Sequence, residues 1–227
     1  MKNLCTICAR KGSKGVPNKN IKKIAGKPLI QHTIEQAKDS GIFQDIIVSS
    51  DSERIIKIAK SLGVHFLKRS KKLSADNVGK VEVIQNATLY AEKILKMEFD
   101  NVIDLDVTSP LRKISDIKKA YHKFKEMGFD NLVTGCLSRK NPYFNMLEEV
   151  NDGIQISKKP NRKVLSRQKS PKVFDMNASI YIWKKQALMK KIDIVHSGTG
   201  FYEMPEERSI DIDTKLDWEI VSYLMER

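Results

Sequence analysis

A glycine-containing segment near the start of the sequence combines backbone freedom with a cluster of positive charge. The segment from Arg10 to Lys27 holds seven Lys or Arg residues and no acidic residue, and its glycines are Gly12, Gly15 and Gly26. Glycines allow backbone amides to turn toward an anion, and the basic side chains add positive charge around it. We therefore expect a polyphosphate ligand. The segment contains neither GxxxxGK[ST] nor GxGxxG, so a nucleotide has to be argued from further residues.

Two aspartates near the end of the sequence are candidates for binding a metal ion. Asp211 and Asp213 are separated by Ile212, and side chains two residues apart in an extended segment point to the same side. Both carboxylates can then face one site. Hard oxygen ligands suit Mg²⁺, which keeps most of its waters and bridges to phosphate oxygens. The alternative is that one or both acids cap a helix that begins near Thr214.

A third polar group follows an apolar stretch in the middle of the sequence. Residues 101–105 are typical of a buried strand, which ends in Asp104 and Asp106 before a turn that begins at Thr108. In a doubly wound sheet, ligands bind at the carboxyl ends of the strands, so we expect this turn on the ligand-binding edge. Asp104 has an alternative role as a structural carboxylate.

Four blocks along the sequence occur in the order found in one enzyme family. The first covers residues 9–20 and has the pattern A-R-x-x-S-K-G-x-x-x-K-N. The others are Thr108-Ser109-Pro110-Leu111-Arg112, Asn177-Ala178-Ser179-Ile180-Tyr181 and Ser209-Ile210-Asp211-Ile212-Asp213-Thr214. With these blocks the sequence resembles the CMP-acylneuraminate synthetases, the cytidylyltransferases that activate sialic acid and related nonulosonic acids. The resemblance extends from about residue 3 to about residue 222.

The resemblance implies that the basic loop binds CTP. The residues that it assigns to the nucleotide are Ala9, Arg10, Ser13, Lys14, Lys19 and Asn20 in the loop, with Arg69, Asp76 and Lys80 further along the chain. Among them, Arg10, Lys14 and Lys19 are the expected catalytic residues, because they would stabilise the charge that develops as pyrophosphate departs. The family favours a small hydroxyl residue where this sequence has Lys80, so Arg69 is the better candidate for contacting the base.

The resemblance also implies a nonulosonic acid as the second substrate. The residues that it assigns to the sugar are Asp106, Thr108, Ser109, Arg167, Gln168, Asn177 and Tyr181. Arg167 is expected near the sugar carboxylate, which a guanidinium can bind through two hydrogen bonds. The family commonly has Gln where this sequence has Asp106, and Ile194-Val195 replaces an aromatic pair that lines the N-acetyl pocket of some sialic-acid enzymes. These departures favour a relative of sialic acid, such as a legionaminic-type acid.

Strand-like and helix-like segments alternate through the first 137 residues, and they must position these groups. The expected strands are 4–8, 45–50, 64–68, 101–105 and 132–137, and the expected helices are 28–40, 52–62, 80–97 and a segment from 115 or 116 to about 128. This alternation is typical of an α/β protein whose mostly parallel sheet has helices on both faces. A strand at 179–183 and a helix at 214–225 complete the pattern.

The resemblance implies a Rossmann-like, three-layer fold of the kind found in nucleotide-diphospho-sugar transferases. We expect a single domain over residues 1–227, interrupted by an insertion at residues 138–175. This insertion has turn signals, short extended runs and a second basic cluster, and such a segment buries little by itself. In the family the equivalent segment is a dimerisation arm that reaches the partner subunit, where it would contribute Arg167. A homodimer is therefore expected.

The composition agrees with one globular domain in a reducing compartment. The chain has 227 residues, of which 41% are hydrophobic. No apolar run is long enough to span a bilayer, and the N-terminus lacks a signal-peptide pattern, so we expect no membrane partner. Cys5 and Cys8 have CxxC spacing, but they fall in a strand without a second Cys/His pair. We interpret them and Cys136 as structural thiols and expect a cytoplasmic location.

The net charge of +13 allows two interpretations, an anionic small substrate or RNA. Much of the excess is concentrated in the first loop and in the stretch from Lys158 to Lys172, which again holds seven basic residues and no acid. Neither basic stretch, Lys11–Lys27 or Lys158–Lys172, contains a Phe, Tyr or Trp that could stack on bases. We therefore expect no nucleic-acid partner, although an RNA-binding module is the alternative class.

Together these features predict an enzyme that joins CMP to a nine-carbon sugar acid. The anomeric hydroxyl of the sugar would attack the α-phosphorus of CTP in line with the leaving pyrophosphate, and Mg²⁺ at Asp211 and Asp213 would neutralise charge. No covalent enzyme intermediate is needed. A nucleotidyltransferase for another sugar acid, such as 3-deoxy-octulosonate, or for another nucleotide, is the closest alternative.

Overall fold

The computed structural model describes residues 1–13, 15–159, 166–190 and 193–227, with the backbone but not the side chain of Arg167. The helices are α1 (Leu29–Ser40), α2 (Glu53–Ser61), α3 (Lys80–Leu95), α4 (Ile114–Met127), α5 (Lys185–Lys190) and α6 (Lys215–Met225). The 3₁₀ turns are η1 (Lys19–Ile21), η2 (Lys72–Ser74), η3 (Arg167–Lys169) and η4 (Glu206–Arg208).

Strands from all parts of the chain form one mixed sheet with the order β11-β7-β10-β6-β1-β4-β5. These strands are β1 (Asn3–Cys8), β4 (Asp45–Ser50), β5 (His65–Lys68), β6 (Asn101–Leu105), β7 (Asn131–Leu137), β10 (Phe174–Lys184) and β11 (Thr199–Glu203). Strand β10 is antiparallel to its neighbours β6 and β7, whereas the other neighbouring pairs are parallel. The carboxyl ends of the parallel strands therefore share one edge of the sheet.

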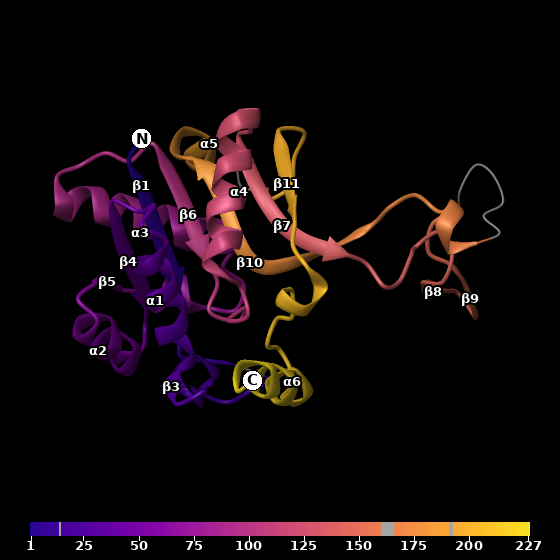
Figure 1. The fold of residues 1–227 in the computed structure, drawn as a ribbon, viewed down its shortest axis with the longest axis horizontal. Coiled ribbons are helices and arrows are strands. Elements are labelled where there is room, and N and C mark those ends of the chain that lie inside the picture. The colour runs from indigo at the N-terminus through magenta and orange to yellow at the C-terminus, as the bar shows by residue number, and fades with distance from the viewer. Residues whose placement is uncertain (14, 160–165, 191–192) are drawn as a thin grey trace.

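Helices cover both faces of this sheet, as the alternating pattern predicts (Figure 1). Consecutive residues of β1 show the division, because Leu4 packs with α3 on one face and Cys5 packs with α1, α2, α4 and α6 on the other. Helix α5 lies on the face of α3. The three-layer α/β architecture expected from the sequence is thus confirmed.

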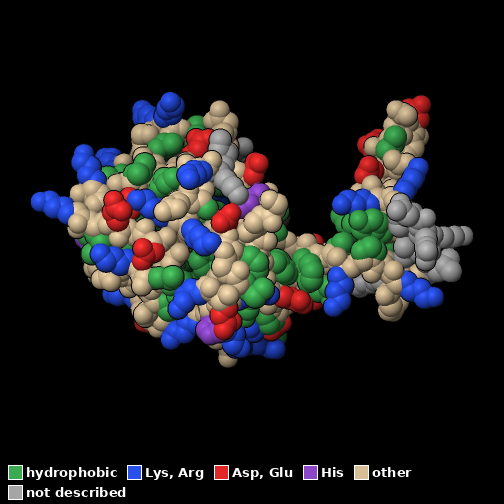
Figure 2. Space-filling view, turned by 90° about the horizontal axis from the view of Figure 1, so that it is seen from above, with side chains coloured by type: hydrophobic (Ala, Val, Ile, Leu, Met, Phe, Trp, Pro, Cys, Tyr) green, Lys and Arg blue, Asp and Glu red, His purple; other side chains and the backbone are tan. Residues whose placement is uncertain are grey.

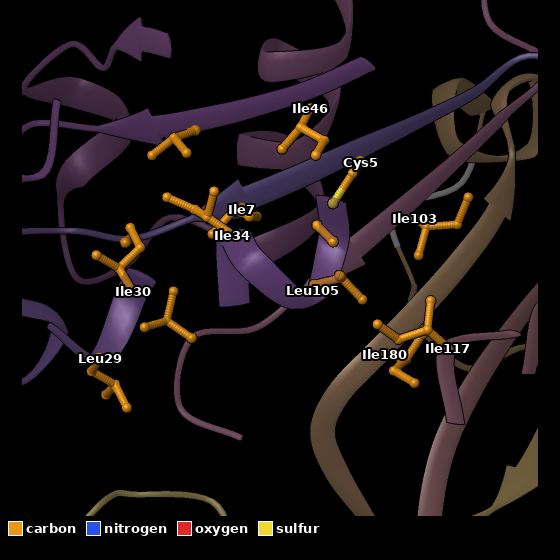
Figure 3. Packing of buried hydrophobic residues seen from close by; sticks show 14 of the residues in the cluster. Cys5, Ile7, Leu29, Ile30, Ile34, Ile46, Ile103, Leu105, Ile117 and Ile180 are labelled. Carbon is orange, nitrogen blue, oxygen red and sulfur yellow. The ribbon is translucent and has the colours of Figure 1, made fainter. Parts of the chain in front are cut away.

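Branched apolar side chains fill the largest of the hydrophobic clusters. Figure 3 shows Ile30 and Ile34 of α1, Ile7 of β1, Leu105 of β6 and Ile117 of α4 in this cluster, and all of them are buried. Their spacing along α1 places one apolar stripe against the sheet, so burial of that stripe stabilises the helix where it lies. The core holds the strand ends in fixed positions beneath the loops that follow them.

Local signals fix the ends of the two helices that border the loops of interest. Helix α1 follows Pro28, which has a φ of −55°, and it ends at Gly41, whose φ of +65° suits glycine. Helix α6 begins with a capping box in which Thr214 accepts a hydrogen bond from the amide of Asp217, and the Asp217 side chain accepts one from the amide of Thr214. The segment before α6 is thereby held at the start of a stable helix.

The observed elements differ from the expected ones mainly at β10, β11 and α5. Strands 45–50 and 101–105 have the expected bounds, but β10 begins at Phe174 rather than at residue 179. Its extra residues pair with the end of β7 before a shift of register between Met176 and Tyr181. Strand β11 and helix α5 were not expected, because their short sequences carry no clear periodicity.

Two small hairpins lie outside the main sheet. Strand β2 (Lys23–Ile24) pairs with β3 (Lys27–Pro28) directly before α1, and strand β8 (Leu147–Val150) pairs with β9 (Gly153–Ile156). The second hairpin lies in a projection formed by the described residues between β7 and β10, which we call the arm. The arm extends away from the sheet on a narrow neck (Figures 1 and 2).

Candidate functional site

The loops at the carboxyl edge of the sheet enclose a polar depression with two parts. The first part has a volume of about 360 Å³, and the second of about 240 Å³. The first part is lined by Cys8, Arg10, Gly12, Ser13, Gly15, Lys19, Asn20, Asp106, Val107, Thr108 and Asp213. The second is lined by Cys8, Arg10, Arg69, Leu73, Ser74, Ala75, Asp76, Val78, Lys80, Val83 and Asp106. Because three residues line both parts, the two form one continuous pocket.

Hydrogen bonds from neighbouring elements shape the loop that follows β1. The amide of Ala9 donates to the carbonyl oxygen of Ser49 (3.0 Å), which ties the start of the loop to β4. Asn20 in η1 donates from Nδ2 to the carbonyl oxygen of Arg10 (3.0 Å). The Arg10 guanidinium forms an ion pair with Asp76 on the opposite side of the pocket. The loop is therefore bent back on itself, with Arg10 between the two parts of the pocket.

Glycine is required at position 15 by the close approach of a second segment. A Cβ atom on Gly15 would lie 1.8 Å from the backbone oxygen of Asp213, far inside van der Waals contact. No such contact surrounds Gly12, where a Cβ would meet no atom within 4 Å. The absence of a side chain at position 15 thus allows the basic loop to touch the Asp211–Asp213 segment.

Lys19 also connects the basic loop to the Asp211–Asp213 segment. Its side chain is mostly buried, and its ammonium donates to the carbonyl oxygen of Ile212 and to Oδ1 of Asp213, at 3.2 Å from the latter. Asp213 itself is exposed toward the pocket. Arg10 and Asp213, which come from opposite ends of the sequence, therefore line one pocket.

Asp211 lies deeper than Asp213 and keeps one oxygen available. Its Oδ2 accepts a hydrogen bond from the amide of Ala178 (2.8 Å), whereas its Oδ1 is buried and has no hydrogen-bond partner among the described residues. Burial raises the pKa of Asp211 to about 6, and the nearby charges of Asp106 and Asp213 also raise it. A carboxylate oxygen in this position suits a cation.

The carboxylates present fit a Mg²⁺ ion whose remaining ligands are water and substrate phosphates. The described residues contain no group of three or more His, Cys, Asp or Glu side chains arranged around a common metal position. Mg²⁺ typically uses one or two carboxylates together with water and substrate phosphates, so the Asp211–Asp213 pair beside a basic pocket is the expected arrangement. These two aspartates are the residues that would hold the ion.

Lys80 and Asp106, where the sequence departs from the family pattern, are direct partners. Lys80 Nζ lies 2.5 Å from Oδ2 of Asp106 and 3.0 Å from Oδ2 of the fully buried Asp104, and it stands 4.3 Å above the centre of the Tyr181 ring. Burial lowers the pKa of Lys80, but the carboxylates of Asp106 and Asp104 raise it by more than burial lowers it. The pKa of Lys80 therefore lies well above its usual value. Lys80 therefore carries a charge inside the pocket wall.

Burial likewise disfavours the charged form of Asp106, but the partners of this carboxylate favour it. Burial raises the pKa of Asp106, but the Lys80 ammonium and hydrogen bonds from Thr108 lower it below the usual value. Asp104 accepts a hydrogen bond on Oδ1 from the hydroxyl of Thr6 (2.7 Å), whereas its Oδ2 has only the ion-pair contact with Lys80 among the described residues. Asp104 is fully buried beneath the pocket, as its alternative role as a structural carboxylate would require.

Two buried arginines hold the backbone around the pocket. Arg112 is 1% exposed and donates to the carbonyl oxygens of Asp106 (3.1 Å) and Ser179 (2.8 Å), so it joins the residue that follows β6 to the middle of β10. Burial lowers the pKa of Arg112 to about 10, although the carboxylates of Asp106 and Asp104 act in the opposite direction. Arg69 donates to the carbonyl oxygen of Ser49 (2.7 Å) and lines the second part of the pocket, where the base was expected.

Several expected site residues lie behind or outside this pocket. Ala9, Ser109, Asn177 and Tyr181 are buried behind its lining. Asn177 accepts a hydrogen bond from the Thr134 hydroxyl (2.6 Å). Gln168 lies in the arm, where it lines a separate depression of about 350 Å³. Lys14 and the Arg167 side chain lie outside the described residues, so their expected roles stay predictions.

Two residues that shape the site were not singled out from the sequence. The sequence places Arg112 in one of the four family blocks and Thr6 in a strand, but it indicates no role for either side chain. The signal for Arg112 was a basic residue directly after a turn at the end of a buried strand. A buried arginine there needs several acceptors, which chain carbonyls at strand ends can supply.

Comparisons with known proteins agree with this geometry. The cytidylyltransferase family matches residues 4–226 of the chain. The Post-translational flagellin modification protein B of Campylobacter coli is 45% identical over 98% of this chain and 94% of the relative. The CMP-N,N'-diacetyllegionaminic acid synthase of Campylobacter jejuni is 44% identical over the same shares.

More distant proteins are similar as well. An N-acylneuraminate cytidylyltransferase of Streptococcus agalactiae is 35% identical over 96% of this chain and 52% of the relative. Among solved structures, a CMP:2-keto-3-deoxy-manno-octonic acid synthetase complexed with CTP has a TM-score of 0.71, with 18% identity, and the match covers 99% of this chain and 98% of the other. At that identity the structural likeness concerns the fold.

Proposed function

The chain belongs to the cytidylyltransferase family, and we propose that it transfers CMP from CTP to a nonulosonic acid of the legionaminic type. The observation that carries the proposal is the meeting of the basic loop and the Asp211–Asp213 segment in one pocket. The name of the Campylobacter jejuni relative supports a legionaminic acid as the sugar, and the name of the Streptococcus agalactiae relative supports the same class of nine-carbon acids.

The two parts of the pocket suit the two parts of a nucleotide. The part lined by Ser13 and Lys19 would hold the phosphates, because the basic residues Arg10 and Lys19 line it together with two glycines of the loop. The part lined by Arg69 and Asp76 would hold the base and ribose. Arg10 lies between them, where the α-phosphate of CTP would then be placed.

In the reaction, the anomeric hydroxyl of the sugar attacks the α-phosphorus of CTP. A new oxygen–phosphorus bond forms, the bond from that phosphorus to the bridging oxygen of the β-phosphate breaks, and the hydroxyl loses its proton as pyrophosphate leaves. Arg10 and Lys19 would orient the triphosphate and neutralise the charge that develops. Both substrates are anions, so the positive loop also reduces the repulsion between them.

Mg²⁺ is part of this proposal. Asp211 and Asp213 would hold it, and when bound it would supply charge neutralisation to the phosphate oxygens. Lys19 keeps Asp213 at the edge of the pocket, and the Ala178 amide orients Asp211. These contacts prepare the two carboxylates before the substrates arrive.

We also infer that the arm binds a second copy of this chain. Apolar side chains along the arm are exposed to solvent, and they include Phe144, Met146, Leu147, Val150 and Ile154. Gln168 lies in the arm rather than in the pocket of its own chain, so it and Arg167 would serve the pocket of the partner subunit.

The three cysteines are free, which suits a reducing location such as the cytoplasm. Among the described helices, none is both long and apolar enough to cross a bilayer.

Pyrophosphate release tests the proposed reaction directly. The protein would be incubated with Mg²⁺, each of the four nucleoside triphosphates and a panel of acids: N,N'-diacetyllegionaminic acid, N-acetylneuraminic acid and 3-deoxy-octulosonate. We expect release with CTP and the legionaminic acid, and mass spectrometry should find the CMP-sugar. Preference for 3-deoxy-octulosonate or for another nucleotide would contradict the substrate assignment. A salt-dependent shift of RNA in a gel, without pyrophosphate release, would contradict the enzyme class.

A further inference from the structure

Lys80 extends from the first turn of α3 to the end of β6 and meets two carboxylates there. Its side chain is 23% exposed, Asp106 is 19% exposed and Asp104 is fully buried. The ammonium also lies over the face of Tyr181. The ammonium donates a hydrogen bond to Asp106, whereas Asp104 Oδ2 lies within ion-pair distance of it without a hydrogen bond. Lys80 is therefore engaged within the protein, with little of its charge left for a phosphate.

Asp106 is engaged on both of its oxygens. Oδ2 faces Lys80, whereas Oδ1 accepts hydrogen bonds from the amide and the hydroxyl of Thr108, both at 3.0 Å. A carboxylate with three charge-assisted contacts has little capacity to bind a sugar hydroxyl as well. The contacts instead fix the turn that follows β6.

The same turn holds the segment that carries the metal-binding carboxylates. The carbonyl oxygen of Thr108 accepts a hydrogen bond from the amide of Ile212 (2.9 Å), and Ile212 lies between Asp211 and Asp213. A continuous series of contacts therefore runs from Lys80 through Asp106 and Thr108 to Ile212. It joins the nucleoside part of the pocket to the carboxylates beside the phosphate part.

We propose that Lys80 and Asp106 act as one positioning unit that holds the Asp211–Asp213 segment in place for the reaction. The expected effect on turnover rests on the proposed function, whereas the expected effect on amide exchange at Ile212 does not. Each partner needs the other, because removal of the ammonium leaves two neighbouring carboxylates without their cation inside the pocket wall. Loss of either partner should therefore loosen the Thr108 turn and the Ile212 amide with it.

The structural consequence can be measured without substrates. Hydrogen–deuterium exchange of the Ile212 amide would be compared between the wild-type protein and two variants, Lys80→Met and Asp106→Asn, which keep the size of each side chain. We expect exchange at Ile212 to be faster by about tenfold or more in both variants, since local opening exposes that hydrogen bond. Unchanged exchange at Ile212 in both variants would overturn the inference.

A matched control separates this effect from the loss of any half-buried lysine. Lys185 is also 23% exposed and pairs with Glu92 (3.1 Å), but it lies at the start of α5, by the opposite edge of the sheet. The Lys185→Met variant should leave exchange at Ile212 and the turnover number unchanged. Faster exchange at Ile212 in this control would show a general loosening and would overturn the specific role.

Kinetics distinguish a positioning unit from two independent substrate contacts. With CTP and the sugar acid, each single variant should lower kcat by about tenfold or more while the KM for CTP changes less than about threefold. The double variant should be no slower than the slower single variant, because residues that act as a unit are not additive. Multiplied losses in the double variant, or a rise in the KM for CTP at unchanged kcat, would overturn the inference.

The two proposals fail in different ways. If the wild-type protein releases no pyrophosphate with any acid, the proposed function fails, and the exchange at Ile212 still decides the positioning role. If the Lys80→Met variant does not fold, the Asp106→Asn variant and a Lys80→Arg variant decide it. Lys80→Arg keeps the charge and should keep slow exchange at Ile212, whereas fast exchange in it and slow exchange in Asp106→Asn would overturn the inference.

Discussion

The pocket and the arm use their side chains in opposite ways. In the pocket wall, polar groups such as Lys19, Asp104 and Arg112 are buried and held by several partners each. In the arm, apolar groups such as Leu147 and Ile154 are exposed, at 59% and 72%. The usual distribution of polar and apolar residues is thus reversed in both regions, and Figure 2 shows apolar side chains on the surface of the arm.

Each reversal has a physical reason that points to a partner. A buried charge is stable only with opposite charges or hydrogen bonds around it, and such fixed charges agree with the anionic ligand and the cation proposed for the pocket. An exposed apolar surface gains free energy when another surface covers it, so the arm is suited to a second protein chain. The contrast predicts that pocket variants affect turnover and that arm variants affect assembly.

The largest effect on turnover should come from the Asp211→Asn variant. The amide keeps the size of the side chain and an oxygen that can accept from Ala178, but it removes the charge that would hold Mg²⁺. We expect kcat to fall by about 100-fold or more, because a bound metal ion supplies several kcal/mol of charge stabilisation. Pyrophosphate release at saturating CTP measures it, and chelation of Mg²⁺ should have a similar effect on the wild-type protein.

Asp45→Asn is the control for the loss of a half-buried aspartate at the other end of the strands. Asp45 begins β4 and lies near His65 (3.5 Å), away from the pocket. Turnover should stay at the wild-type level in this variant. Wild-type turnover in Asp211→Asn itself would contradict the proposed role of that carboxylate.

The second prediction concerns the contact between the loop and the Asp211–Asp213 segment. The Gly15→Ala variant should lose about 1–3 kcal/mol of stability, because the added methyl group collides with the Asp213 backbone oxygen. Turnover should fall as the two segments separate. Chemical denaturation measures the stability, and Gly12→Ala, where space is open, should keep the wild-type value. Equal stability of both variants would show that the close approach is not required.

The third prediction sharpens the role of the arm. The Ile154→Asp variant should raise the dissociation constant of the dimer by roughly tenfold or more, since a charge replaces a large apolar side chain in the expected interface. Light scattering over a range of protein concentrations measures the change. Leu89→Asp is the matched control, because Leu89 is an equally apolar residue on α3 and is 55% exposed. Equal weakening by both substitutions would contradict the role of the arm.

The smallest effect concerns two thiols of β1, Cys5 in the core and Cys8 in the pocket lining. Burial raises the pKa of Cys5 and Cys8 well above the ordinary value, and Asp104 raises it further. The thiolate is the reactive form, so a raised pKa lowers its fraction at every pH below that pKa, and reactivity should appear only as the pH rises. At pH 8 iodoacetamide should label both cysteines far more slowly in the native protein than in denaturant. Rapid labelling of native Cys8, detected by mass spectrometry, would contradict this.

Much of the fold could be predicted because its signals are local. The alternation of strands and helices, the ends of β4 and β6, and the helix end at Gly41 follow from periodicity and turn chemistry. Strand β11 was missed because its five residues lie at the sheet edge without a clear alternation. The early start of β10 could not be predicted, because the sequence of its first residues carries no strand signal. They become a strand by pairing with the end of β7, which lies far away in the sequence.

The sequence by itself determined which residues carry charge and where the chain can turn: a basic loop with Gly15, an acidic pair at Asp211 and Asp213, and alternating elements between them. Only the tertiary structure decided which of these groups meet. Lys19 and Asp213 are 194 residues apart, and Lys80 and Asp106 are 26 apart, so no local pattern records their contacts. Such contacts depend on the order of strands in the sheet and on close packing between elements, which burial of the whole core sets at once.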